Sequence, residues 1–456
     1  MASTHYHGAL RRQRQIWLSG RRWRMRIVLW GGAIIVGVVS VVFAWAANRA
    51  QDLFNYWLIS PWLSLALTPA GFLASVYLAR TLFPGSQGSG IPQAIAARHL
   101  RDNASRSRLL SMKMTIGKII LTLLGLASGA SIGREGPTVQ VGASLMLGTA
   151  KLGGMGGERG LILAGSAAGV AAAFNTPLAG IVFAIEEMSR AFETRTTGLV
   201  LIAVILAGLA SLGLVGNYSY FGHSSSMLLV TIDWVAVAVC GIVGGLAGAL
   251  FCWLLVKGAK VTQDFIAPEP MKRALILAGG CGLTVALCGI LSGGATYGTG
   301  YEAARSAVEG HGLAFSFAPL KFIATVASSV SGMPGGLFAP SLSVGAGIGS
   351  MVARLLGVHA VGAIVLLGMT GYFAGVVQAP ITSFVIIQEM SDSYGMKIPL
   401  MLTALIGYGV SHLFQRQSLY HALAEGFMGE ENHGGHEQAQ PAPAAEAAEV
   451  SPQSSR

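Results

Sequence analysis

The sequence predicts an all-α polytopic membrane protein with two internally repeated halves, whose discontinuous, tilted helices have N-termini that meet near the membrane centre. Three observations lead to this fold class. The 456 residues are 53% hydrophobic and only 11% charged, with a mean hydropathy of +0.60. The apolar segments differ in length, and several are interrupted by glycine or proline. A pattern of glycines and prolines recurs at one fixed spacing later in the chain.

The low share of charged residues excludes an ordinary soluble protein, in which about a quarter of the residues are charged. Apolar segments near 20 residues can cross about 30 Å of hydrocarbon, whereas the shorter ones stop partway through the lipid bilayer. The 62 glycines suit this class, because small residues let membrane helices pack closely. Although the net charge is +10, we expect no nucleic-acid partner.

Basic residues gather at the N-terminus, where seven arginines lie between positions 11 and 26. By the positive-inside rule, residues 1–26 are predicted to form a basic cytoplasmic segment. The apolar run 27–47 is longer than the core of a signal peptide, so we expect an uncleaved first transmembrane helix rather than a cleaved signal.

The C-terminal composition changes near position 425, after which the chain is polar and rich in alanine and proline. We therefore predict a disordered tail over 425–456. Its HGGH stretch at 433–436 would bind metal weakly or be solvated only. Cysteines occur at four positions in apolar segments without metal-ligand spacing, so we expect core residues and no metal site: Cys240, Cys252, Cys281 and Cys288.

An internal repeat relates GREGPTVQVGA (133–143) to GLFAPSLSVGA (336–346). Five identical pairs stand 203 positions apart: Gly133 and Gly336, Pro137 and Pro340, Val141 and Val344, Gly142 and Gly345, and Ala143 and Ala346. The register reaches Pro177 and Pro380, after which PLAGIVFAIEEM and PITSFVIIQEM remain alike with one residue dropped. Within a membrane domain over 27–424, this predicts two halves, about 27–215 and 230–424, in a parallel or an inverted relation.

Four short motifs stand out: GSGIP (88–92), GREGP (133–137), GGLFAP (335–340) and SLYHAL (418–423). In the first three, glycines precede a proline and an apolar run. Proline suits the first turn of a helix, and glycine lets the backbone approach a ligand. Helix starts carry about half a positive charge, so several of them aimed at one point form an anion site. GSGIP alone would indicate an ordinary loop before a helix, but the combination favours the anion site.

These motifs, in this order and spacing, resemble the CLC family of chloride channels and proton-coupled chloride transporters. The resemblance covers about residues 27–424. It implies voltage-sensitive chloride transport, coupled to proton exchange, in a homodimer with one ion pathway per subunit. It implies no cofactor beyond bound chloride ions. The regulatory domains of many eukaryotic members are not expected in so short a tail, which indicates the inner (plasma) membrane of a prokaryote.

The resemblance also implies roles for particular residues. The hydroxyls of Ser89 and Tyr420 and the backbone amides near Leu337 and Phe338 would bind a central chloride. Serine in GSGIP is typical of chloride-preferring rather than nitrate-preferring members. The surrounding motif residues would support this site: Gly88, Gly90, Ile91, Pro92, Gly133, Arg134, Gly136, Pro137, Gly336 and Pro340.

By the same resemblance, Glu135 would be the gate. Ionised, its carboxylate would occupy an anion position at the helix starts; protonated, it would swing away and admit chloride. Its counterpart in the repeat is Phe338, which cannot titrate. The alternative is a structural ion pair with Arg134, but an ionisable residue inside a membrane favours a functional role.

Glu186 and Glu187 end an apolar run, and adjacent helical residues point about 100° apart, so only one is expected to face inward. Glu187 resembles the internal proton-transfer glutamate of the family's antiporters; the alternative is a solvated acid at a helix end. Gln93 and Ile95 replace acids of some bacterial relatives and leave the inner proton route less defined. Lys118 matches a basic position of the family and would tune the local field or only snorkel.

Two other functions stay open. A passive chloride channel would share the fold and the anion site, although Glu187 favours exchange. An intramembrane enzyme would use Glu186, Glu187 and a histidine. The chain has no HExxH motif, and His412 stands alone in its apolar segment, so we predict a transporter and not an enzyme.

Overall fold

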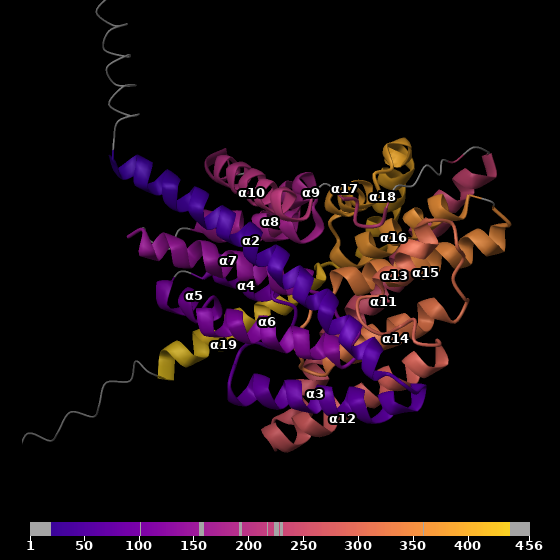
Figure 1. Cartoon of the computed structure of the whole chain (residues 1–456), viewed down its shortest axis with the longest axis horizontal. Helices are drawn as coiled ribbons and strands as arrows, with labels where there is room; N and C mark the ends of the chain where they lie inside the picture. Colours follow the sequence, from indigo (N-terminus) through magenta and orange to yellow (C-terminus); the bar gives the residue numbers. More distant parts are fainter. Residues whose placement is uncertain are drawn as a thin grey trace, which may run out of the picture.

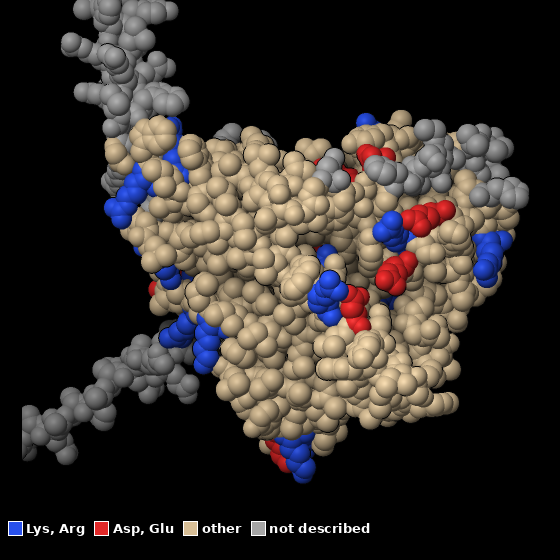
Figure 2. All heavy atoms as spheres, in the orientation of Figure 1, with Lys and Arg blue, Asp and Glu red and all other residues tan. Residues whose placement is uncertain are grey.

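The computed structural model describes residues 20–100, 102–154, 159–190, 194–216, 218–222, 228, 231–358 and 360–437. Throughout this part of the chain the regular elements are helices, which confirms the predicted fold class. Eight of the described helices are long and apolar enough to cross a membrane. Figure 2 shows that most of the surface on one face carries no charged side chain. Large apolar side chains such as Trp45, Trp62 and Leu413 stay exposed, as contact with lipid would allow.

The described residues of the first half form nine α-helices, a 3₁₀ turn and a π-helix. They are α2 (Gly20–Trp57), η1 (Pro61–Leu63), α3 (Ser64–Thr81), α4 (Ile91–His99), α5 (Asn103–Leu109), α6 (Met112–Ala127), α7 (Glu135–Leu152), α8 (Arg159–Phe174), α9 (Pro177–Phe183), η2 (Ala184–Ser189) and α10 (Thr194–Val215). The π-helix is η2, and it ends the run that contains Glu186 and Glu187.

Where the structure describes the second half, it forms nine α-helices and a 3₁₀ turn. They are α11 (Thr231–Ile266), α12 (Pro270–Leu291), α13 (Tyr301–Val308), α14 (Phe317–Val330), α15 (Phe338–Leu356), α16 (Val361–Val377), α17 (Pro380–Ser391), η3 (Tyr394–Met396), α18 (Lys397–Phe414) and α19 (Leu419–Glu437). In Figure 1, α7, α8 and α10 lie on one side of the molecule, α11, α15, α16 and α18 lie on the other, and α2 runs across the middle.

The core of each half is a helix that is apolar on every side. Every residue of α8 after Arg159 is buried, and so is every residue of α16 after Val361. Helices without a polar face are buried in this way. The long helices of each half pack around these two, α7 and α10 against α8, and α11, α15 and α18 against α16.

The two halves are related by a local two-fold axis. Glu186 accepts hydrogen bonds from the backbone N–H groups of Ile381 (3.1 Å) and Thr382 (2.6 Å) at the start of α17. Its repeat counterpart, Glu389, accepts the equivalent bonds at the start of α9, from Leu178 (3.1 Å) and Ala179 (2.7 Å). Contacts that are reciprocal between equivalent residues are the mark of a two-fold relation.

This pairing identifies Glu187 as the residue that the second half lacks. Glu186 and Glu389 stand 203 positions apart, but Met188 and Met390 stand 202 apart. The extra residue falls inside η2, and a π-helix holds one more residue per hydrogen-bonded turn than an α-helix. The insertion leaves Glu186 in its capping role. The side chain of Glu187 points in a different direction and is buried.

The helices at both ends of the chain extend beyond the predicted boundaries. α2 begins at Gly20, so residues 20–26 belong to the first helix rather than to a separate basic segment. α19 continues to Glu437, whereas the sequence analysis predicts disorder from 425. The cause is apolar packing, because Phe427 and Met428 contact the core. The side chains of 429–437, and with them HGGH, lie outside the described residues, as do 1–19 and 438–456.

Removing either capping glutamate should destabilise the fold to a similar degree. Glu186→Ala and Glu389→Ala each leave two N–H groups of a helix start without a partner. We expect each to lower the free energy of unfolding by about 0.5–2 kcal/mol, the usual range for a lost N-terminal cap. Thermal unfolding in detergent measures this, with the exposed Glu425→Ala as the control. An unchanged midpoint for both variants would contradict the two-fold capping.

Candidate functional site

Three of the four motifs meet where the two halves join. Gly133 and Gly336, equivalent in the repeat, exchange two backbone N–H to carbonyl hydrogen bonds of 2.7 Å each. Gly335 donates a third bond to the carbonyl of Gly88 (3.3 Å). The starts of α4, α7 and α15, which follow these loops, are therefore held around one place. The positive ends of three helix dipoles meet there.

The approach of these loops depends on the absence of a side chain at Gly136. A Cβ at this position would lie 2.7 Å from the carbonyl oxygen of Ser89 and 3.2 Å from the Cα of Gly336. Any larger residue would push the start of α4 away from the start of α7. Gly136 therefore brings Ser89 against the GREGP loop.

Buried polar atoms without a partner gather around this junction. The Ser89 hydroxyl, the Tyr420 hydroxyl and both carboxyl oxygens of Glu135 have no hydrogen-bond partner. Ser89 is 6% exposed, and Tyr420 and Glu135 are fully buried. A buried polar atom without a partner is costly, so several in one place point to a ligand that supplies the contacts. A reversibly bound anion or proton would provide hydrogen-bond partners for these atoms.

Backbone amides face the Glu135 carboxylate from two helix starts. They belong to Arg134 and Glu135 at α7 and to Ala339 at α15. The carboxylate itself lies over Gly133. The carboxylate therefore lies near two helix starts, although neither of its oxygens makes a well-formed hydrogen bond.

The predicted binding residues of α15 and α19 lie together. Leu337 precedes α15 and Phe338 begins it, so their amides belong to the free helix start. The Phe338 ring lies 5.8 Å from the Tyr420 ring, centroid to centroid. Phe338 also contacts three further rings, those of Phe174, Phe183 and Phe373. This aromatic cluster fixes Tyr420 beside the start of α15.

Two cavities approach the junction and contain residues of different motifs. One, of about 590 Å³, is lined by Ser89 and Leu337 and extends along α11 and α19. The other, of about 530 Å³, is lined by Arg134, Asn48 and Tyr301. Arg134 directly precedes Glu135 in sequence, so one cavity reaches the GREGP loop and the other reaches the GSGIP and GGLFAP loops.

The ion-pair alternative for Glu135 is wrong. The Nη1 of Arg134 donates instead to α2, to the carbonyl of Ala44 and the side chain of Asn48, each at 2.6 Å. Neither carboxyl oxygen of Glu135 has a partner. Arg134 therefore ties GREGP to α2 rather than to Glu135.

Lys118 does not snorkel, because its side chain is fully buried. Its Nζ donates to the carbonyls of Gln87 (3.1 Å) and Gly88 (2.9 Å), directly before Ser89. Its repeat counterpart, Lys321, is also fully buried and holds the carbonyls of Thr296 and Gly298 before α13. Lys118 thus positions the loop that presents Ser89. The sequence analysis missed Lys321, although the register of the repeat points to it.

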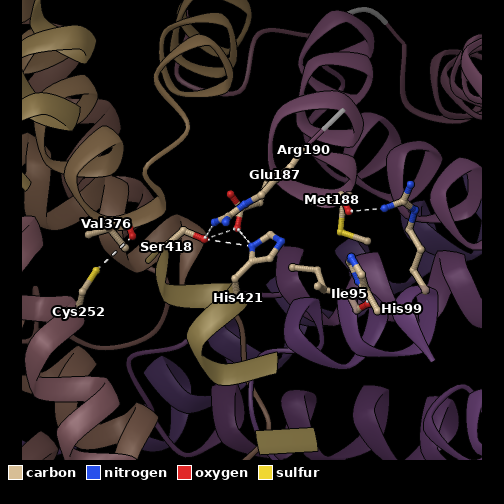
Figure 3. A network of polar contacts seen from close by, with 10 residues as sticks. Ile95, His99, Glu187, Met188, Arg190, Cys252, Val376, Ser418 and His421 are labelled. Carbon is tan, nitrogen blue, oxygen red and sulfur yellow. Dashed lines mark hydrogen bonds and ion pairs between the residues drawn. The ribbon is translucent and has the colours of Figure 1, made fainter. Parts of the chain in front are cut away.

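Glu187 is only 1% exposed, so it is not a solvated acid at a helix end. It lies in a polar network with residues of the SLYHAL motif (Figure 3). Ser418 Oγ donates to its Oε1 (3.1 Å), and His421 Nδ1 lies 3.3 Å from the same oxygen. Ser418 and His421 flank Tyr420 in sequence, so one helix start contacts both the junction and Glu187. The sequence analysis quoted this motif but gave neither residue a role.

The neighbourhood of a serine, a histidine and an acid does not form a hydrolytic triad. Such a triad uses one ring nitrogen for the serine and the other for the acid. Here Nδ1 of His421 contacts both Ser418 and Glu187. A G-x-S-x-G pattern does occur at 129–133, but its Ser131 is buried and bonded to Thr325. Among the described residues no cluster of His, Cys, Asp and Glu could hold a metal ion.

Comparisons with known proteins agree with this architecture. The voltage gated chloride channel family model matches residues 70–412. H(+)/Cl(-) exchange transporters named ClcA, from Salmonella typhi and Salmonella typhimurium, are 30% identical over 405 residues, which cover 81% of this chain and 82% of theirs. These relatives are transporters, which sets the enzyme alternative aside.

Solved structures share the fold. A slow cyanobacterial Cl-/H+ antiporter matches with a TM-score of 0.76 and 24% identity, over 90% of this chain and 99% of that one. A CLC-type fluoride/proton antiporter matches with a TM-score of 0.74 and 20% identity, over 87% and 96% of the two chains. With its eight apolar helices and the family model matched over most of its length, this chain is a multi-pass membrane protein of the voltage gated chloride channel (CLC) family.

Proposed function

We propose that this protein exchanges chloride for protons across the inner membrane of a prokaryote. One observation carries the proposal: unpaired, buried polar atoms of Ser89, Tyr420 and Glu135 surround the joined starts of three helices. The named function of the Salmonella relatives supports the same choice of ions. The N-terminus is proposed to be cytoplasmic and the protein a homodimer.

In the proposed anion site, chloride contacts the hydroxyls of Ser89 and Tyr420 and the amides near Leu337 and Phe338. Partial charges of helix starts attract the anion, and no full positive charge is aimed at it by the motifs. The affinity is then strong enough for selective entry and weak enough for release. Lys118 acts indirectly, by holding the carbonyls of the loop before Ser89.

Glu135 is proposed to act as the gate between the two cavities. Ionised, its carboxylate lies at the helix starts and blocks the path of chloride. Protonated, it loses its attraction to those dipoles and yields the position to chloride. Anion and proton therefore compete for one place, which is the physical origin of exchange.

The proposed exchange is electrogenic. A chloride ion that moves one way and a proton that moves the other way transfer charge in the same direction. Each transferred charge changes the driving free energy by about 2.3 kcal/mol per 100 mV. Sensitivity to voltage follows without a separate sensor helix. The alternative of a passive channel is disfavoured by the buried, hydrogen-bonded Glu187, for which a channel has no use.

The first test is proton movement in proteoliposomes that hold a chloride gradient and no proton gradient. Potassium and valinomycin clamp the voltage at zero. We expect chloride that leaves the liposomes to drive protons inward against their growing gradient. Chloride efflux with no proton uptake would overturn exchange and favour the channel.

Glu135→Gln should uncouple the two ions. The amide has no charge to take a chloride position and no proton to deliver. We expect proton uptake to fall to the level of protein-free liposomes, while chloride efflux continues. The same assay measures both fluxes. Normal chloride-driven proton uptake in this variant would remove Glu135 from its proposed role.

Glu187→Gln should selectively reduce proton uptake. We expect proton uptake to fall at least about tenfold, because proton transfer by a positioned side chain contributes at least this much. Chloride affinity, measured by calorimetry, should stay unchanged. The matched control is Glu186→Gln, whose carboxylate caps α17 and should affect stability rather than coupling. Equal loss of proton uptake in both variants would contradict the assignment to Glu187.

A further inference from the structure

The proposed role of Glu187 requires a route by which protons reach its buried carboxylate. The carboxylate is 1% exposed, while the ring of His421 beside it is 17% exposed. Figure 3 shows this ring, at the start of α19, directed toward Glu187. Gln93 and Ile95 in α4 provide no acid there. A proton bound for Glu187 therefore needs another carrier.

The hydrogen bonds around Ser418 indicate which ring nitrogen of His421 carries a hydrogen. The single hydroxyl proton of Ser418 is donated to Glu187 Oε1. Arg190 Nη2 donates to Ser418 Oγ at 2.8 Å, which takes one of its lone pairs. The remaining contact of Ser418 is with His421 Nδ1 at 3.1 Å. Ser418 can only accept there, so Nδ1 carries a hydrogen and shares it with the Glu187 carboxylate.

We propose that His421 carries protons between the solution that reaches its partly exposed ring and Glu187, with Ser418 and Arg190 as positioning residues. The inference rests on the proposed role of Glu187 and adds a residue that belongs to this chain's own SLYHAL motif. A histidine is suited to this task, because its unperturbed pKa lies within the physiological range.

The proposed transfer balances in protons. The ring first takes a proton from water at Nε2 and becomes an imidazolium. The Nδ1–H bond then breaks and an O–H bond forms at Glu187 Oε1, 3.3 Å away. The ring is left neutral with its hydrogen on Nε2, and tautomer exchange with water resets it. Ser418 keeps its own proton and holds the two partners in line.

Charged and titratable groups around the ring shape this step. Glu187 opposes His421 directly, and His99 of α4 lies 6.5 Å away, centroid to centroid. The His99 Nδ1 contacts the carbonyl of Ile95 at 2.9 Å. Charged groups on the described parts of the adjoining segments include Arg98, Glu186, Arg190, Arg416 and Glu425.

The test compares His421→Asn with the wild-type protein in the chloride-driven proton assay. Asparagine keeps a donor close to the position of Nδ1 but cannot take up a proton. We expect proton uptake to fall at least about tenfold, with chloride affinity unchanged. The pH dependence of the remaining proton uptake should flatten between about pH 5 and 8. His412→Asn, a histidine stacked on Tyr408 at the end of α18, is the matched control.

Chemical rescue separates a carrier from a packing residue. His421→Ala should lose proton uptake similarly, and added imidazole should restore part of it. Chloride flux in the same liposomes reports that each variant is folded. Wild-type proton uptake in His421→Asn, or loss in His421→Ala that imidazole does not relieve, would overturn the inference. If the wild-type protein moves no protons at all, the proposed exchange fails, which is a different result.

Discussion

The reciprocal hydrogen bonds between Gly133 and Gly336 are the constraint on which the site depends. Each loop satisfies the backbone of the other, so neither half can complete its helix start alone. Irregular backbone inside a membrane is tolerated only where protein or a water-filled cavity satisfies its polar groups. The junction meets this condition by the two-fold pairing of the halves. It also leaves the helix starts beyond the loops free for an anion.

Departures from this symmetry coincide with the residues proposed to move protons. The repeat counterpart of Glu135 is Phe338, so only one half supplies an acid at the junction. Glu187 is the residue inserted into η2, and its neighbour Glu186 keeps the capping role shared with Glu389. The contacts shared by the two halves thus stabilise the fold. The residues proposed to move protons, Glu135 and Glu187, have no acidic counterpart of their own in the second half.

The sequence predicts the fold class, the repeat and the meeting of GREGP with GGLFAP, because these depend on composition and on a fixed register. The sequence alone does not decide between Glu186 and Glu187, because the position of the single-residue gap in the repeat is ambiguous. Contacts such as those of Ser418 and His421 with Glu187 join positions more than 230 residues apart, and no local pattern encodes them. Lys118 was misjudged in part because an apolar helix gives no sign of which side is buried. The roles of the chloride-binding residues stay predictions.

The start of α19 connects the two proposed ion paths. Tyr420, whose hydroxyl is proposed to bind chloride, packs on Phe338, while Ser418 and His421 on either side contact Glu187. Ser418, Tyr420 and His421 lie within one helical turn. A displacement of this turn therefore moves groups at both the proposed anion site and Glu187. Occupation of the anion site would restrain Tyr420 and with it the pair of His421 and Glu187. Coupling then needs no long-range rearrangement, because one turn of helix supplies groups to both ions.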